Sequence, residues 1–194
     1  MRRVIAALRI SVDGFIEGPN GELDWVDTWE DLFDLSRQID ACVLGAGMYL
    51  GYEQYWRAIL AKPEDILPFT GRVPSPGEIE YARFADQTPH FVLSTTLKSV
   101  HWPTARIIRS VDDIRLMKQQ RGKDIYAVGG AALISSLMNM DLVDEIRLVV
   151  HPVVLGGGKA LFKHVNGRHA LALTDVAQIA SGPVRLIYRR RHAA

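Results

Sequence analysis

The chain has 194 residues, of which 48% are hydrophobic and 23% are charged, and its formal net charge is +1. This composition is ordinary for a globular protein, and the length predicts a single domain over residues 1–194. A net charge so close to zero generates no field that attracts nucleic acid or an anionic membrane, so neither is an expected partner.

The cysteine and histidine content sets further limits. Cys42 is the only cysteine, so an internal disulfide is excluded, and its apolar neighbours predict a buried, unreactive thiol in a cytoplasmic protein. The six histidines form no paired motif with it, and no metal site is predicted. No apolar run approaches the roughly 18 residues of a membrane span.

The first third of the chain predicts a strand, a loop and a helix. Residues 3–10 are apolar on both faces, as expected for a strand in the middle of a covered sheet. The following loop contains an Asp-Gly turn at Asp13. Thr28 is a suitable N-cap for a helix whose apolar side chains continue to Ile39.

The next segment predicts a second strand and a long connection. Residues 41–44 are apolar and end at Gly45 and Gly47, but this Gly-x-Gly does not follow the first strand, so a Rossmann fold is not predicted. Residues 61–77 are rich in proline and glycine and predict one long irregular connection, which is either a lid that covers the substrate pocket or a disordered segment. A short helix is expected at residues 78–85.

Two further strands and a helix are predicted before the middle of the chain ends. Residues 90–93 and 104–109 have strand character, and residues 110–121 have helical spacing. The turn after the first of these strands carries Ser94 and Thr95.

A strand, a glycine pair and a helix follow in close succession. Residues 125–128 form a short apolar run that stops at Gly129 and Gly130, and apolar residues then recur at helical spacing. With a strand at residues 146–150 this predicts a βαβ unit with parallel pairing. A glycine pair that opens a helix lets backbone N–H groups approach a phosphate, although a tight turn without a ligand explains the same residues.

The last part of the chain completes the predicted fold. Residues 170–180 and 184–191 are two strands joined by a hairpin-type connection. We therefore predict a three-layer α/β/α fold with four or five helices. Its mostly parallel central sheet has about eight strands and an antiparallel C-terminal hairpin.

Several sequence words match a known family in order and spacing. They are Val-Gly-Gly-Ala-Ala-Leu, Leu-Val-Asp-Glu-Ile-Arg-Leu and His-Pro-Val-Val-Leu-Gly-Gly-Gly-Lys-Ala-Leu-Phe. Over nearly its full length the chain resembles the dihydrofolate reductase-like superfamily, above all the reductase domain of the riboflavin-biosynthesis deaminase/reductase. The resemblance implies NADPH as cofactor, a homodimer, and a cis peptide between Gly129 and Gly130.

The resemblance also implies which residues contact the cofactor. They are Ala7, Ile16, Gly45, Gly47, Met48, Ser94, Thr95, Gly129, Gly130, Ala131, Ala132 and Leu133. The chain departs from the family at both turns that commonly offer an arginine to phosphate, since it has Ala46 at one and Thr95-Thr96 at the other. Lys98 is the nearest cation in the sequence. Because the two arginines are missing, NADH or another cofactor remains an alternative to NADPH.

Two carboxylates are candidates for catalysis. Asp13 matches the acid of the Ser-x-Asp-Gly loop in the riboflavin-pathway relatives and is the first choice as acid or orienting group. Glu30 is the second choice, because the folate reducers place a carboxylate on the helix predicted here.

Three functions remain open at this stage. The resemblance implies an NADPH-dependent reductase of a pteridine- or pyrimidine-like substrate, of the 5-amino-6-(5-phosphoribosylamino)uracil reductase type. The alternative is a non-catalytic small-molecule or nucleotide-binding protein on the same scaffold. A general aldehyde or ketone reductase would need a Tyr/Lys acid pair, such as Tyr49 or Tyr52 with Lys159.

Overall fold

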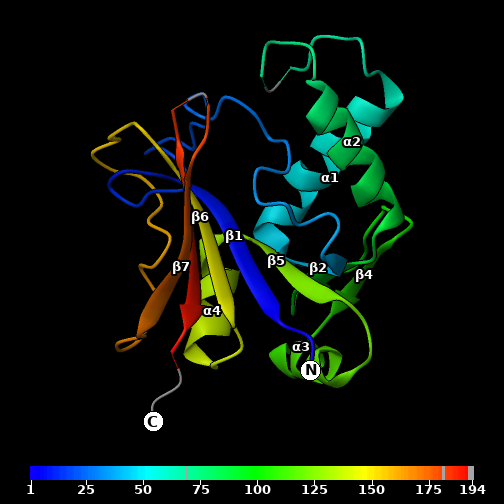
Figure 1. Cartoon of the computed structure of the whole chain (residues 1–194). Coiled ribbons are helices and arrows are strands. Elements are labelled where there is room, and N and C mark those ends of the chain that lie inside the picture. Colours follow the sequence, from blue (N-terminus) through cyan, green and yellow to red (C-terminus); the bar gives the residue numbers. More distant parts are fainter. Residues whose placement is uncertain (69, 181, 192–194) are drawn as a thin grey trace.

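An eight-stranded sheet forms the centre of the computed structural model, which describes residues 1–194 except 69, 181 and 192–194 (Figure 1). The strands are β1 (Val4–Ser11), β2 (Ile39–Gly45), β3 (His90–Leu93), β4 (Ala105–Ile108), β5 (Asp124–Gly129), β6 (Glu145–His151), β7 (Leu171–Gln178) and β8 (Val184–Arg190). Their order is β4-β3-β2-β5-β1-β6-β8-β7, in which only the β6–β8 and β8–β7 pairs are antiparallel. The predicted fold class is confirmed.

Helices cover both faces of this sheet. They are α1 (Ala46–Ala61), α2 (Pro76–Gln87), α3 (Val111–Gln119) and α4 (Ala131–Asn139). Alternate residues of β1 divide between the two faces: Ala6 and Leu8 pack with α3 and α4, whereas Ile5 and Ala7 pack with α1 and α2. No helix in the described part of the chain has both the length and the apolarity to cross a membrane.

The predicted βαβ unit is present with one difference. β5 and β6 are both parallel to β1, but β1 lies between them, with Val4 opposite Ile125 and Ala6 opposite Ile146. The two strands therefore do not pair with each other as the simple crossover predicts. β1 is the central strand of this half of the sheet.

The helix predicted from Thr28 to Ile39 does not form. The Asp31 carboxylate instead accepts hydrogen bonds from the backbone N–H groups of Phe33, Leu35 and Ser36, at 3.2, 2.7 and 2.7 Å. Short polar side chains that bind nearby backbone donors compete with the helical hydrogen-bond ladder in this way. The segment is an irregular loop, and Glu30 lies in it.

Three arginines of the sheet hold this loop. Arg9 donates to the carbonyl oxygen of Glu30 at 2.6 Å. Arg147 donates to the carbonyl oxygen of Phe33 at 2.6 Å, and Arg185 to that of Leu32 at 3.4 Å. These bonds supply partners for backbone acceptors that a helix would have satisfied internally.

Glu78, at the start of α2, joins four separate segments. Its carboxylate receives both terminal nitrogens of Arg72 at 2.8 Å, the hydroxyl of Tyr55 at 3.0 Å, and the backbone N–H groups of Trp29 and Ser75 at 2.8 Å each. Burial alone would raise the pKa of Glu78, but these donors outweigh burial and hold the pKa at about 2.

The long connection between α1 and α2 is irregular as predicted. α1 ends at Ala61 and α2 begins at Pro76, and residue 69 between them lies outside the described residues. Figure 1 shows this connection at the end of the α1–α2 pair that is farther from the sheet. Its role as a cover for the substrate stays a prediction.

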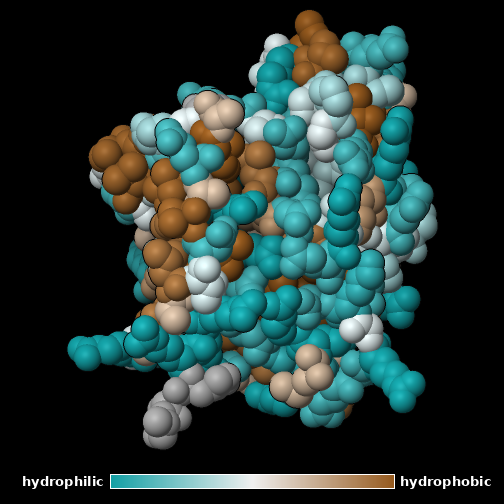
Figure 2. Space-filling model, in the orientation of Figure 1, coloured by the Kyte–Doolittle hydropathy of each residue, from teal (hydrophilic) through white to brown (hydrophobic). Residues whose placement is uncertain are grey.

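The outer strand of the sheet, β7, is exposed over most of its length. Leu173 and Val176 are 53% and 58% exposed, and Figure 2 shows hydrophobic side chains gathered on this side of the molecule. Exposed apolar side chains on an edge strand are typical of a surface that another chain covers. The homodimer itself stays a prediction.

We expect the Glu78→Gln substitution to lower the free energy of unfolding by about 3 kcal/mol, because Arg72 loses its buried ionic partner. Since the pKa of Glu78 is depressed, its contribution is complete above pH 4.5 and is lost as the pH falls toward about 2. Urea denaturation of both proteins at pH 7 and pH 3 measures this. Equal stability of the two proteins at pH 7 would show that the Glu78 cluster does not hold these segments.

Candidate functional site

Two glycine turns meet at the carboxyl ends of β2 and β5. Leu44 of β2 pairs with Gly129 of β5. A Cβ atom on Gly45 would lie 3.6 Å from Leu133 Cβ and 3.9 Å from the backbone nitrogen of Gly130. The peptide between Gly129 and Gly130 is cis, as the resemblance implied. The structure thus brings together the two predicted glycine turns.

The four helices differ in how they begin. α2 and α3 start with the serine capping boxes of Ser75 and Ser110, and both have acidic residues in their first turn. α1 and α4 start after Gly45 and Gly130, without a capping side chain and without an acidic residue in the first turn. Their first N–H groups and the positive ends of their dipoles are therefore available to an anion, and a phosphate suits both requirements.

The residues around these helix starts differ in accessibility. Gly47 and Ala132 are exposed, whereas Ala131 and Leu133 are buried. Met48 is half-buried, and its sulfur lies 3.1 Å from where a Cβ atom on Gly129 would be. A Cβ atom at position 129 would make a tight contact with the Met48 side chain, and the positive φ of Gly129, 138°, favours glycine.

Ala7 lies beside this edge in the central strand. Its carbonyl oxygen accepts a hydrogen bond from the hydroxyl of Tyr126 at 3.1 Å. Both residues face the layer formed by α1 and α2. The β1 backbone here is fixed by its neighbours on each side.

The turn after β3 has a cation that the sequence analysis missed. Ser94 is buried, and its hydroxyl oxygen accepts from the N–H groups of Thr96 and Leu97, while Thr95 is exposed. Arg109, just past β4, donates to the carbonyl oxygen of Ser94 at 2.7 Å. Lys98 is therefore not the cation that contacts Ser94. Leu93 pairs with Ile108, so the parallel register of β3 and β4 is what brings Arg109 to this turn.

The loop that follows β1 is fastened to the loop that follows β6. The N–H of Ile16 donates to the carbonyl oxygen of Lys159 at 2.9 Å, and the N–H of Lys159 donates to that of Glu17 at 3.0 Å. The side chains of Lys159 and Glu17 also form an ion pair. Gly158 makes the close approach possible, since a Cβ atom there would lie 2.1 Å from the Glu17 carbonyl oxygen.

Asp13 belongs to the same pair of loops. Its exposed carboxylate accepts from the backbone N–H groups of Leu155 at 3.2 Å and Gly156 at 2.8 Å. The pKa of Asp13 is lowered by a hydrogen bond from Ser11 and by these two backbone donors. All of these bonds favour the ionised carboxylate, which suits an orienting role better than proton donation.

Glu30 has different surroundings. The hydroxyl of Ser75 donates to its carboxylate at 3.3 Å, and the side chain lies against Gly77 at the start of α2. Asp13 therefore bonds the loop after β6, whereas Glu30 bonds the start of α2. No interaction joins the two carboxylates among the described residues.

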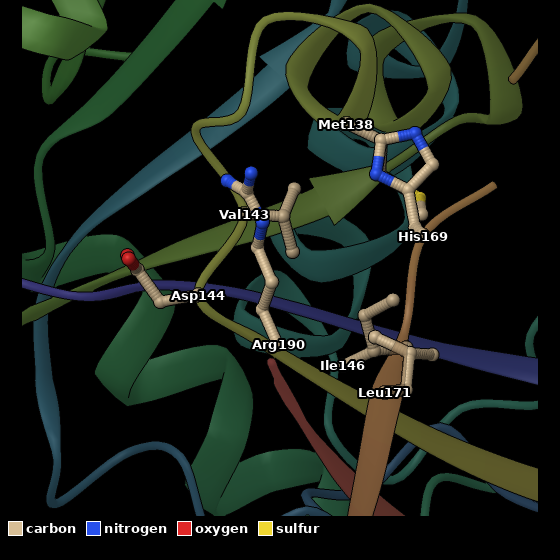
Figure 3. A pocket seen from close by; sticks show the side chains of 7 residues that line it. All are labelled: Met138, Val143, Asp144, Ile146, His169, Leu171 and Arg190. Carbon is tan, nitrogen blue, oxygen red and sulfur yellow. The ribbon is translucent and has the colours of Figure 1, made fainter. Parts of the chain in front are cut away.

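Two cavities lie away from these turns. Figure 3 shows one of them, lined by Met138 of α4, Ile146 of β6 and Leu171 of β7 among others, with a volume of about 10 Å³. This is room for one water molecule at most. The second, of about 550 Å³, lies nearby over Arg168, Arg190 and Arg191. Neither cavity is lined by a predicted site residue.

The mostly parallel eight-stranded sheet with its antiparallel C-terminal pair is a dihydrofolate reductase-like fold. Residues 2–184 match the RibD C-terminal domain, and the chain belongs to this family. The predicted relationship is thus confirmed.

Comparison with known proteins agrees with this assignment. Uncharacterized protein YyaP of Bacillus subtilis (strain 168) is 35% identical over 190 residues, which are 96% of this chain and 94% of that protein. A putative riboflavin biosynthesis protein from Shewanella sp. PV-4 has a TM-score of 0.73 at 19% identity, covering 98% of this chain and 99% of the other. Dihydrofolate reductase from Enterococcus faecalis, in complex with NADP(H), has a TM-score of 0.59 at 16% identity, covering 98% and 97%. The two solved structures share the fold.

We expect the Gly158→Ala substitution to destabilise the chain by about 2 kcal/mol or more, because the new methyl group meets the Glu17 carbonyl and φ is 128°. Chemical denaturation measures the loss. Gly156→Ala is the matched control, since its φ of 70° also strains an alanine whereas a Cβ atom there has no neighbour within 4 Å, so the additional loss at Gly158 reports the contact with Glu17. If both variants lose the same stability, the pairing of the two loops does not depend on close contact at Gly158.

Proposed function

We propose that the chain is an NADPH-dependent reductase that transfers a hydride to a carbon of a pteridine- or pyrimidine-like heterocycle. The observation that carries this proposal is the meeting of two uncapped, glycine-started helices, α1 and α4, at the carboxyl ends of the adjacent strands β2 and β5. Ligands of open α/β sheets bind outside these strand ends. Membership in the RibD C-terminal domain family supports the reductase class.

The residues present fit NADPH in three places. The N-terminal N–H groups of α1 and α4 suit the diphosphate. Ser94, Thr95 and Arg109 suit the additional phosphate of NADPH, because a guanidinium forms charge-assisted bonds that a hydroxyl cannot supply. Backbone groups near Ala7 and Ile16 would contact the nicotinamide. NADPH, once bound, supplies the hydride, and the protein holds the two reacting carbons in line.

Asp13 has an orienting role in this proposal. Its lowered pKa keeps the carboxylate ionised at neutral pH, so it accepts hydrogen bonds and does not deliver a proton. It also fixes the loop after β6 against the loop after β1, which carries Ile16. The ionised carboxylate and the fixed loops would together position the groups around the nicotinamide and the substrate.

The finer assignment is a reductase of the 5-amino-6-(5-phosphoribosylamino)uracil reductase type. The family supports it, and one structural neighbour from Thermotoga maritima is described as a deaminase and reductase of this type; it has a TM-score of 0.63 at 15% identity. The chain covers 57% of that neighbour. Lys159, a candidate for the substrate phosphate, already pairs with Glu17 and would have to leave it.

The Arg109→Gln substitution tests the cofactor assignment. We expect NADPH to raise the melting temperature of the unsubstituted protein more than NADH does, because Arg109 would contact the phosphate that only NADPH carries. A ligand present at 100 times its Kd adds about 2.7 kcal/mol to the free energy of unfolding. The substitution should weaken NADPH binding about tenfold or more, because it removes a charged hydrogen bond, and should leave NADH binding unchanged. Arg106→Gln is the control, because Arg106 lies in β4 shortly before Arg109 but contacts the ring of Phe91.

Two results would contradict this assignment. Equal affinity of the unsubstituted protein for NADPH and NADH would show that Arg109 does not bind the additional phosphate of NADPH. No response to either nucleotide would overturn the reductase proposal and favour a non-catalytic binding protein.

The Asp13→Asn substitution tests the orienting role. We expect NADPH oxidation with a heterocyclic acceptor to slow about tenfold or more, because the amide cannot replace the charge that holds both backbone donors. NADPH binding should remain within about threefold. Glu22→Gln is the control, since Glu22 is an exposed carboxylate that accepts hydrogen bonds from Asn20 in its own turn. Unchanged turnover in Asp13→Asn would contradict the assignment.

A further inference from the structure

Arg9 is a cation without an anionic partner inside the sheet. It lies in β1 opposite Val149, and no ion pair involves it among the described residues. The guanidinium carbon lies 5.3 Å from the ring centres of both Trp29 and Phe33. Of its five N–H donors, one bonds the carbonyl oxygen of Glu30, while Nε is buried and has no partner.

The groups around Arg9 do not neutralise it. Burial lowers the pKa of Arg9, and the nearby Tyr126, Tyr81, Asp31 and Glu30 oppose this only in part. The carboxylate of Asp31 is occupied by backbone N–H groups of its own loop, and that of Glu30 bonds Ser75. An unsatisfied buried charge is costly, so this donor set is suited to a partner that the chain itself does not supply.

A second unpartnered group lies on the same face. His151 pairs with Ser11, two residues beyond Arg9 in β1. Its Nε2 is buried without a partner, and its ring packs edge-on against Trp25 at 5.3 Å. Burial and the charge of Arg9 lower the pKa of His151, which keeps the ring neutral.

The spacing between Arg9 and Ala7, near which the nicotinamide is proposed to bind, also suits a substrate ring. Ala7 and Arg9 project to the same face, and two residues of a strand span about 7 Å. This is the width of a heterocyclic ring with its substituents. A ring placed beside Ala7 would therefore reach the Arg9 guanidinium, with the ring of Trp29 close by.

From these contacts we propose that Arg9 determines substrate specificity and recognises a hydrogen-bond acceptor edge, such as the carbonyl oxygens of a pyrimidinedione or a ring carboxylate. The inference rests on the proposed reductase function. An amidine edge presents N–H donors and carries a proton readily, so the Arg9 guanidinium would offer it no acceptor and would repel its charge. The site therefore selects uracil-like rings and rejects diamino-substituted rings.

Titration with two small probes of equal ring size tests this proposal. We use aminouracil, which presents a dione edge, and diaminopyrimidine, which presents an amidine edge, each with and without saturating NADPH. We expect the unsubstituted protein to bind aminouracil at least about tenfold more tightly, as charge-assisted recognition predicts. Arg9→Met should abolish this preference, and Arg9→Lys should retain part of it because the charge remains while the planar fork is lost.

Arg185→Met is the matched control. Arg185 lies on the same sheet face opposite Val149, has a buried Nε without a partner and also holds the 28–36 loop through a carbonyl oxygen. It should leave the preference within about twofold. An equal or reversed preference in the unsubstituted protein, no binding of aminouracil, or an unchanged preference in folded Arg9→Met would each overturn the proposal.

The outcomes also separate this proposal from the reductase function. If NADPH does not bind but aminouracil is still preferred without it, the cofactor assignment fails and the Arg9 site stands. If Arg9→Met does not fold, Arg9→Lys replaces it in the test. A weaker preference for aminouracil in Arg9→Lys than in the unsubstituted protein supports the proposal, and an unchanged preference overturns it.

Discussion

An irregular backbone segment inside a folded protein must find a partner for each buried N–H and C=O group, and residues 28–36 find theirs in side chains. Arg9, Arg147 and Arg185 donate to its carbonyl oxygens from the sheet. Asp31 and Glu78 accept from its N–H groups. These bonds tie the segment to the sheet on one side and, through Glu78, to the start of α2 on the other, so charged groups and not a helix hold this part of the chain in place.

The opposite requirement holds at the glycine turns, where backbone donors are left without partners. α1 and α4 begin at neighbouring strand ends with no capping side chain, whereas the two helices that begin elsewhere have capping boxes. Evolution of a capped start at Gly45 or Gly130 would stabilise the helix but remove the groups that an anion requires. The contrast between the helices therefore indicates that an anion would be bound at the starts of α1 and α4 by backbone N–H groups and not by one particular side chain.

Most of the fold follows from short-range patterns in the sequence. Apolar runs and a hairpin pattern predicted the eight strands, and glycines marked the turns at Gly45 and Gly129, because burial and backbone freedom act locally. The helix from Thr28 was wrong because one carboxylate, Asp31, outcompetes the helical ladder. Arg109 was missed because its contact with Ser94 depends on strand register, and the role of Arg9 depends on which neighbours fail to neutralise it.

The central position of β1 has a consequence for the order of folding. Both neighbours of β1 come from the second half of the chain, as Val4 pairs with Ile125 and Ala6 with Ile146. During synthesis β2, β3 and β4 are available to each other long before β1 has any partner. Both edges of β1, and the edge of β2 that later pairs with β5, stay open until β5 and β6 are synthesised, which is a period of exposure to aggregation. Contacts of such large sequence separation also predict slow folding for a chain of this size.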